Sequence, residues 1–186
     1  IVQRGLDRIN ALILNMLTFS KDREPLLKNV NVGQVLRECV ELATPAADDR
    51  RIALITELPD IMEIPADAAG LHQAFLNLIT NAMDAVEDET GAITVSVRLD
   101  TMNRCITVQV ADNGSGIDPA KINDIFTPFF SSKGQKGTGL GLAVARKITE
   151  EHHGQILVSS EPSSGTTFTI HLPIQRKSDT ITGQRV

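Results

Sequence analysis

Two neighbouring segments of the chain alternate apolar and polar residues with a period of two. They are GAITVSVRL at residues 91–99 and RCITVQVAD at residues 104–112. This alternation predicts β-strands with one buried face, and the short polar stretch between them predicts a β-hairpin. The buried face of such a hairpin needs a covering layer, so other segments of the chain must pack over it.

The surrounding sequence predicts that layer and the rest of the sheet. Besides the hairpin, the pattern predicts helices at 33–48, 67–87 and about 138–152, and strands at 51–58, 155–160 and 165–173. We therefore expect an α+β fold, a two-layer α/β sandwich with a mixed sheet and helices on one face.

Residues 1–20 predict a long bundle helix in front of this domain. Apolar side chains recur there at spacings of four, three, four and three, at Val2, Leu6, Ile9, Ile13 and Met16. A helix this apolar needs partner helices, although packing on its own domain is the alternative. The expected domains are this helix, a polar linker at 21–29, a main domain at 30–174 and a polar tail at 175–186.

Composition narrows the functional classes. The chain has 186 residues, 41% of them hydrophobic and 22% charged, which is enough to build a folded core. A net charge of −5 argues against nucleic-acid binding, which needs a basic face. The sequence begins with Ile, has no signal peptide and has no apolar run near the length of about 18 residues that spans a membrane. Cys39 and Cys105 lack metal-ligand spacing. We expect a cytoplasmic piece of a longer protein with reduced thiols.

Two asparagines on the predicted helix 67–87 are candidates for metal binding. Asn77 and Asn81 are one turn apart and share a polar face. Such a pair is commonly solvated. The functional interpretation is that amide oxygens face Mg²⁺, which prefers oxygen ligands and completes its shell with water and phosphate.

The segment DNGSG follows the second strand of the hairpin. It is either a simple turn or a binding element in which the Asp112 carboxylate accepts a hydrogen bond from an exocyclic amine. In the second case, Gly114 and Gly116 let the backbone approach a flat ring closely.

The segment GTGLGL, residues 137–142, opens the predicted helix 138–152. Backbone amides at a helix start attract phosphate. The spacing matches neither the P-loop nor the dinucleotide fingerprint. Lys133 and Lys136, just upstream, either reach phosphate or are solvated surface charges.

Three of the six phenylalanines lie within five positions, at Phe126, Phe129 and Phe130. They either pack in the core or form a latch beside a mobile loop, residues 131–137, that orders around a nucleotide.

The order of these motifs is more specific than any one of them: NLITNA, DNGSG, IFTPFFSSK, GTGLGL and GTTFTIHLP. From about residue 1 to 174, the sequence resembles the catalytic and ATP-binding domain of two-component sensor histidine kinases. That domain belongs to a superfamily shared with gyrase, mismatch-repair ATPases and the large heat-shock chaperone.

The resemblance implies a role for each motif, with ATP and Mg²⁺ as cofactors. It implies that Asn81 binds Mg²⁺, that Asp112 binds adenine directly and that Thr166 binds it through water. The second glycine motif would cover the phosphates, and Lys133 would contact them under a short lid. The site residues implied are Asn77, Asn81, Asp112, Gly114, Gly116, Phe130, Lys133, Gly137, Thr138, Gly139, Leu140, Gly141, Leu142 and Thr166.

The same resemblance implies partners. Residues 1–20 are similar to the second helix of the family's dimerisation and phosphoacceptor hairpin, and the helix with the acceptor histidine is absent. None of the four histidines (His72, His152, His153 and His171) has the acceptor's sequence context. We therefore expect a module that phosphorylates a histidine on another segment, for relay to a response regulator receiver domain. The full-length protein would be a homodimer, with any membrane anchor in its missing segments. This chain alone would not autophosphorylate.

Three alternatives stay open. In the superfamily's ATP-hydrolysing machines, a Glu one turn before the metal-binding Asn activates water. Here that place holds Asn77, which cannot take a proton. A serine kinase of the anti-sigma-factor type would lack the bundle helix. A non-enzymatic binding module would not need all four ATP motifs intact.

Overall fold

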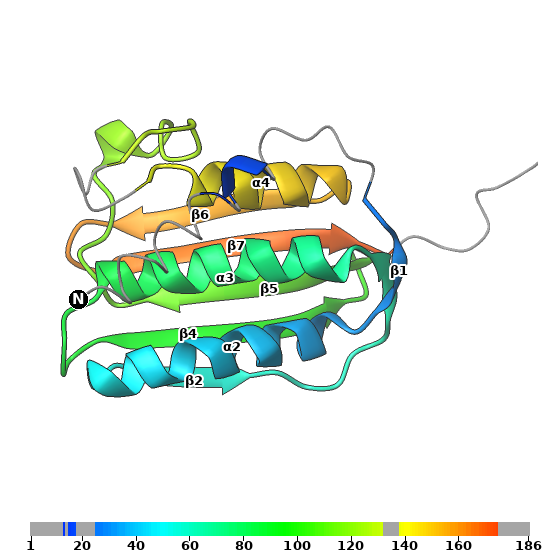
Figure 1. The fold of residues 1–186 in the computed structure, drawn as a ribbon, viewed down its shortest axis with the longest axis horizontal. Helices are drawn as coiled ribbons and strands as arrows, with labels where there is room; N and C mark the ends of the chain where they lie inside the picture. The colour runs from blue at the N-terminus through cyan, green and yellow to red at the C-terminus, as the bar shows by residue number, and fades with distance from the viewer. Residues whose placement is uncertain (1–12, 14, 18–24, 132–137, 175–186) are drawn as a thin grey trace, which may run out of the picture.

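The structure, a computed structural model, describes residues 13, 15–17, 25–131 and 138–174. Figure 1 shows the main sheet with the long helices packed over it. In chain order the elements are β1 (Lys28–Val30), α2 (Val32–Asp49), β2 (Ala53–Glu57), β3 (Ile64–Ala66), α3 (Ala68–Ala85), β4 (Ala92–Asp100), β5 (Cys105–Asp112), the short 3-10 helix η1 (Pro119–Lys121), α4 (Gly141–Glu151), β6 (Gln155–Glu161) and β7 (Gly165–Pro173).

The main sheet has five strands in the order β2-β4-β5-β7-β6. Strand β2 runs parallel to β4, and the other pairs are antiparallel, so the sheet is mixed as predicted. The predicted hairpin is β4–β5. Its turn is held by Asp100, whose carboxylate accepts hydrogen bonds from the backbone and side-chain nitrogens of Asn103 at 2.9 and 2.7 Å. These bonds lower the pKa of Asp100.

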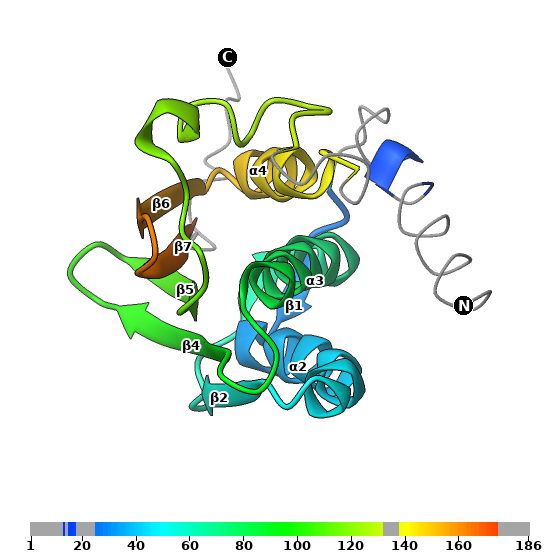
Figure 2. The same cartoon turned by 90° about the vertical axis from the view of Figure 1, so that its left-hand side faces the viewer.

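Helices α2, α3 and α4 all cover the same face of this sheet (Figure 2). The core lies between the two layers, because the alternating apolar residues of the strands point toward the helices. Its fully buried side chains include Phe75 and Leu78 from α3 and Val95, Ile106 and Phe168 from the sheet. The predicted two-layer α+β sandwich is confirmed.

A second sheet of two short strands was not predicted. Strands β1 and β3 pair antiparallel, with Val30 opposite Ile64 and Lys28 opposite Ala66. The first of them starts within the segment 21–29, which the sequence predicts to be a linker. Three residues are too few to show a period, and Pro65 in β3 argues locally against a strand.

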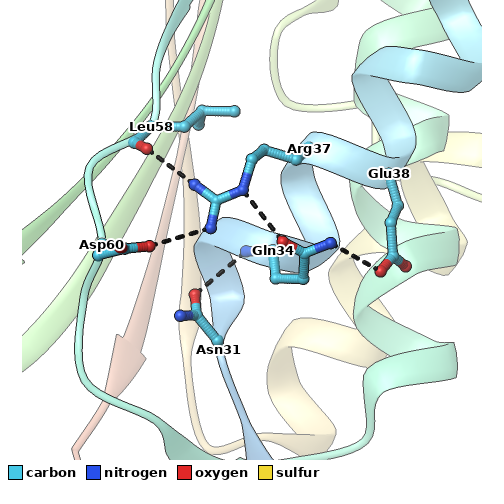
Figure 3. A network of polar contacts seen from close by, with 6 residues as sticks. All are labelled: Asn31, Gln34, Arg37, Glu38, Leu58 and Asp60. Carbon is cyan, nitrogen blue, oxygen red and sulfur yellow. Dashed lines mark hydrogen bonds and ion pairs between the residues drawn. The ribbon is translucent and has the colours of Figure 1, made fainter.

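Helix α2 holds the chain that leaves β2 (Figure 3). Arg37 donates to the carbonyl oxygen of Leu58 at 2.9 Å and pairs with Asp60 at 3.2 Å. Gln34 accepts from Arg37 Nε at 3.1 Å and orients the guanidinium. The Asp60 side chain is 91% exposed, so the bond to the Leu58 carbonyl is the main restraint on this segment.

Helices α3 and α4 are tied together by a buried histidine. His152, which follows α4, accepts a hydrogen bond at Nε2 from the backbone nitrogen of Asp67, the N-cap of α3, at 2.9 Å. Its Nδ1 lies 2.8 Å from the carbonyl oxygen of Ile148, which can only accept. The two bonds together require the neutral tautomer with the proton on Nδ1.

Little of the predicted bundle helix belongs to the described residues. Residues 13 and 15–17 form a helical turn beside α3 and α4 (Figure 2). Ile13 and Met16, from the predicted apolar stripe, are about half exposed, at 48% and 50%. The rest of segment 1–20 and the tail 175–186 lie outside the described residues. Within the described part of the chain, no helix is long and apolar enough to cross a membrane.

Candidate functional site

Three polar side chains form a row at one end of the sheet, on the face that the helices cover. Asp112 ends β5 and pairs with Thr166 of β7, and Thr166 pairs in turn with Ser160 of β6. Asp112 and Thr166 are only 9% and 5% exposed. A buried carboxylate and a buried hydroxyl at a strand end can recognise a polar ring edge that enters from the loop side.

The glycines after Asp112 are required by backbone packing. A Cβ on Gly114 would lie 2.3 Å from the carbonyl oxygen of Ala85 near the end of α3, and one on Gly116 would lie 2.0 Å from that of Glu161. Gly116 also has a positive φ of +67°. The Gly114 nitrogen donates to an Asp112 carboxylate oxygen at 2.9 Å. The glycines therefore seat the loop against α3 and β6 and hold the carboxylate. The structure gives their close neighbours as protein carbonyls, whereas the sequence suggested a ligand ring.

The two asparagines of α3 are half-buried, and Asn77 contacts α4. Asn77 Nδ2 donates to the carbonyl oxygen of Gly141 at 3.1 Å and to Asn15 Oδ1 at 3.2 Å. These bonds use both N–H groups, so the amide presents its oxygen to any further ligand. Asn81 follows one turn later on the same helix. Asn77 is therefore part of a helix–helix contact and not simply solvated.

The start of α4 has no side-chain cap. The N-cap position holds Leu140, which makes no side-chain capping bond, whereas Asn31, Asp67 and Asp118 cap α2, α3 and η1. An uncapped helix start leaves its amides and the positive end of its dipole available to an anion. The α4 N-terminus is therefore the candidate phosphate site.

The predicted helix start at 138 was three residues too early, because a sharp turn precedes α4. Gly139 has a φ of +66°, and a Cβ there would lie 2.5 Å from the carbonyl carbon of Phe129. The Phe129 nitrogen donates to the Gly139 oxygen at 2.9 Å. The hydroxyl of Thr138 accepts from the Leu140 nitrogen at 3.3 Å. At Gly141, in contrast, a Cβ would meet only the Asn77 side chain, at 3.6 Å or more.

Two leucines in this segment have core positions. Leu140 is 1% exposed, and Leu142 packs against the core cluster. Their apolar side chains cannot bind phosphate, so any contribution to a phosphate site would come from their backbone groups.

The phenylalanine cluster is divided between core and surface. Phe126 packs edge-to-face on Phe168, with ring centroids 6.3 Å apart, and the Arg146 guanidinium lies 5.8 Å from its ring centre. Phe130 packs against the core, while Phe129 is 69% exposed. Phe126 and Phe130 are therefore both packed on the core while part of each side chain stays accessible. Lys133, Lys136 and Gly137 lie in segment 132–137, outside the described residues.

Sequence reasoning missed Ser160. It lies in the row with Asp112 and Thr166 and contacts three groups described below. The signal was available in principle, because the period of β6 places Ser160 on the core face, where a hydroxyl needs partners. The partners themselves, Ile117, Gly165 and Thr166, could not be read from this local pattern.

These features define one class of site. A buried acceptor at the strand end suits a nucleobase, an uncapped glycine-flanked helix start suits phosphates, and the amide oxygens between them suit a hard cation. Together with the two-layer sandwich, they define an ATP-binding domain of the histidine kinase type.

Several known proteins are similar to this chain in sequence. The family model described as "Histidine kinase-, DNA gyrase B-, and HSP90-like ATPase" matches residues 66–176. The chain is 38% identical to the sensor histidine kinase ZraS of Klebsiella oxytoca over 94% of its own length and 37% of that protein. It is 36% identical to the signal transduction histidine-protein kinase AtoS of Escherichia coli K12, over 94% of this chain and 28% of AtoS. The chain thus spans about a third of the length of these relatives.

Solved structures share the fold. The catalytic domain of histidine kinase ThkA is 28% identical with a TM-score of 0.71, covering 80% of this chain and 95% of that domain. Full-length ShkA in complex with AMPPNP is 27% identical with a TM-score of 0.77, covering 91% of this chain and 36% of ShkA. ThkA in complex with the response regulator TrrA is 26% identical with a TM-score of 0.76, covering 94% of this chain and 50% of that chain. This chain belongs to the family of histidine kinase-, DNA gyrase B- and HSP90-like ATPases, and it is similar to the ATP-binding catalytic domains of sensor histidine kinases.

Proposed function

We propose that this module binds Mg·ATP and donates the γ-phosphoryl group to a histidine carried by another segment of a homodimeric, cytoplasmic kinase, which passes it to a response regulator receiver domain. The names of the relatives support the kinase activity. The ThkA complex with TrrA supports a receiver domain as partner. The half-exposed Ile13 and Met16 support a dimerisation helix in segment 1–20, followed by the linker 21–29, the catalytic domain 30–174 and the tail 175–186.

In this proposal, different described residues contact different parts of the nucleotide. Asp112, seated by Gly114 and Gly116, accepts a hydrogen bond from the adenine amine, and Thr166 reaches the ring through water. The amides at the start of α4, with Thr138, Gly139 and Gly141, hold the phosphates. Phe130 would close the site beside them, as would Lys133 and Gly137 from the undescribed segment.

The donor set fits a magnesium ion. Asn81 would supply an amide oxygen, and Asn77, whose two N–H groups are both engaged, can offer a further ligand only its oxygen. Bound Mg²⁺ would neutralise charge on the phosphates during transfer. The residues of the chain hold the nucleotide and orient it, which is most of what phosphoryl transfer requires.

One observation favours a kinase over an ATP-hydrolysing machine. Asn77 occupies the position where a hydrolase needs a general base, and an amide cannot accept a proton from water. Both of its N–H groups are used in holding α4 and Asn15. Its position therefore serves to orient the phosphate site, and the attacking group must come from elsewhere.

The test is a labelling experiment with γ-labelled ATP. The purified chain should bind ATP, hydrolyse it slowly and acquire no acid-labile, base-stable label. A full-length partner that has its acceptor histidine but a disabled ATP site should become labelled when the chain is added. Stoichiometric label on the chain alone would overturn the assignment of the acceptor. Rapid hydrolysis without a partner would favour the ATP-hydrolysing machine.

A further inference from the structure

The Ser160 hydroxyl is at the centre of a small hydrogen-bond network next to the proposed adenine site. It accepts from the backbone nitrogen of Ile117 at 2.9 Å. It donates to the carbonyl oxygen of Gly165 at 3.0 Å. It also lies 2.9 Å from the Thr166 hydroxyl, where either oxygen could be the donor.

The number of available protons decides which hydroxyl donates in the Ser160–Thr166 hydrogen bond. A hydroxyl has one proton to give and two lone pairs that accept. The Gly165 carbonyl can only accept, so the Ser160 proton is used there, and the Ile117 N–H occupies one lone pair. The Thr166 hydroxyl must then donate its own proton to the second lone pair of Ser160.

The donation to Ser160 determines which hydrogen-bonding groups Thr166 has left for a ligand. With its proton directed at Ser160, its oxygen has only lone pairs left for any other neighbour. Asp112, its cross-strand partner on β5, carries a carboxylate, which also only accepts. The two side chains therefore present acceptors alone, and a ligand must bring N–H donors, either directly or to one water that donates its two protons to Asp112 and Thr166 and can then only accept.

We propose that Ser160 is a specificity-determining positioning residue, which restricts the Thr166 hydroxyl to an acceptor and so makes the site select a 6-amino purine over a 6-oxo purine. This inference rests on the proposed function, in which Asp112 and Thr166 face adenine. The amine at C6 of adenine supplies two N–H donors. A carbonyl in its place puts lone pairs against lone pairs, and only a freely rotating Thr166 hydroxyl could relieve this.

The test compares ATP with inosine triphosphate, which has a carbonyl at C6 and lacks the 2-amino group of GTP. The readout is the ratio of their dissociation constants, measured by calorimetry on the purified chain. The wild type should prefer ATP by about tenfold or more, since an unmatched buried polar group is costly. Ser160→Ala frees the Thr166 proton, and the ratio should fall about threefold to tenfold.

Matched variants separate this role from a structural one. Ser159→Ala changes the exposed neighbour on the other face of β6 and should leave the ratio unchanged. Ser160→Thr keeps the hydroxyl and should restore the ratio. Thr166→Val should lower the ratio by itself, and adding Ser160→Ala to it should change the ratio no further, because the two residues act through one bond. Ser160→Ala also strips partners from Ile117 and Gly165. If it does not fold, Ser160→Cys, with a weak donor and acceptor, decides the matter by an intermediate ratio.

The outcomes distinguish this inference from the proposed function. A wild type with no preference for ATP would overturn the adenine site itself. A wild type that prefers ATP, with a Ser160→Ala variant that keeps the preference or loses affinity equally for both nucleotides, would overturn the role of Ser160 alone. A Thr166→Val variant with the wild-type ratio would do the same.

Discussion

The side-chain nitrogen of Asn77 donates a 3.1 Å hydrogen bond to the carbonyl oxygen of Gly141, and so joins the middle of α3 to the first residue of α4. At the far end of the same helix pair, His152 accepts from the backbone nitrogen of Asp67. The two bonds fix both ends of the α3–α4 contact. The start of α4, where phosphates are proposed to bind, is therefore positioned by a residue on a different helix.

The first prediction follows from this bond. Asn77→Ala should weaken ATP binding by about tenfold, because the α4 start loses its restraint and a half-buried carbonyl loses its partner. Adenosine, which lacks phosphates, should bind the variant almost as well as the wild type. Calorimetry with the two ligands measures both. Thr80→Ala, on the exposed side of α3, is the control, and an equal loss for ATP and adenosine would count against a role at the phosphates.

The second prediction compares two glycines in the same motif. Gly139→Ala should destabilise the domain by about 1–3 kcal/mol, because Gly139 has a positive φ and its Cβ would meet the Phe129 backbone at 2.5 Å. Gly141→Ala should fold normally, because its Cβ has room. It should nevertheless weaken ATP binding, since the methyl group would lie against the Asn77 side chain, beside the proposed phosphate site. Thermal unfolding and ATP titration of both variants test this, and a Gly141→Ala variant with unchanged ATP affinity would place the phosphates elsewhere.

The parts of the fold with a clear period were predictable from the sequence. Strands β4 and β5 alternate over eight or nine residues, which is enough to identify both the strands and their buried faces. Strands β1 and β3 have three residues each and depend on pairing with one another, a non-local contact that no local pattern shows. The predicted start of α4 was wrong because a glycine permits a left-handed turn, as at Gly139, but its presence in the sequence does not show that such a turn occurs.

For the candidate site, the sequence could propose residues but could not give their contacts. Asp112 and Thr166 were identified by resemblance, and strand register brings them side by side. The sequence could not show that Gly114 packs on Ala85, because that contact depends on where α3 ends. Nor could it show that Ser160 contacts both Ile117 and Thr166, because those contacts depend on the β6–β7 register and on the position of the loop at Ile117.

The third prediction concerns Arg50, which holds the end of α3. Its guanidinium donates to the carbonyl oxygens of Met83 at 2.6 Å and Val86 at 3.1 Å, and pairs with Asp88 at 2.6 Å. Arg50→Ala should cost about 2 kcal/mol, because charged bonds to two carbonyls are lost from a side chain that is only 32% exposed. For a domain of this size, the melting temperature should fall by roughly 4–8 °C.

A neighbouring arginine provides the control. Arg51 pairs with Glu89 at 2.9 Å, but both side chains are mostly exposed, at 75% and 68%. Arg51→Ala should therefore cost less than about 1 kcal/mol. Equal destabilisation by the two variants would show that position in the turn, and not the contacts of Arg50, determines stability here.

The fourth prediction concerns the thiol of Cys39, which α2 and α3 enclose. Burial, followed by the nearby Glu38 carboxylate, raises the pKa of Cys39 to about 12. At pH 8 only about one thiol in ten thousand is then ionised, so iodoacetamide should leave Cys39 unmodified in the folded chain and modify it in guanidinium chloride. Mass spectrometry on a Cys105→Ser variant, in which Cys39 is the remaining cysteine, measures the labelling of this thiol.

The same pKa shift makes stability depend on pH. Because the folded pKa of Cys39 lies above the unfolded value near 9, the stability from the neutral thiol is present below about pH 9 and is lost as the pH rises toward 12. Rapid labelling of Cys39 in the folded chain at pH 8 would contradict the predicted protection of this thiol.

The last prediction separates metal binding from base binding at Asn81. If its amide oxygen contacts Mg²⁺, Asn81→Ala should remove most of the gain in ATP affinity that Mg²⁺ gives the wild type, and should leave adenosine binding in EDTA almost unchanged. The reason is that adenosine engages Asp112 and Thr166 at the far end of the site and carries no phosphate to share the ion. Asn81→Asp keeps an oxygen ligand, so it should retain a response to Mg²⁺, although its negative charge should weaken ATP binding in the absence of metal. Titrations of both variants with ATP in Mg²⁺ and in EDTA, and with adenosine in EDTA, measure each of these affinities. If Asn81→Ala lowered adenosine binding as much as Mg·ATP binding, the asparagine would be supporting the fold of α3, and the proposed magnesium ligand would have to be sought elsewhere.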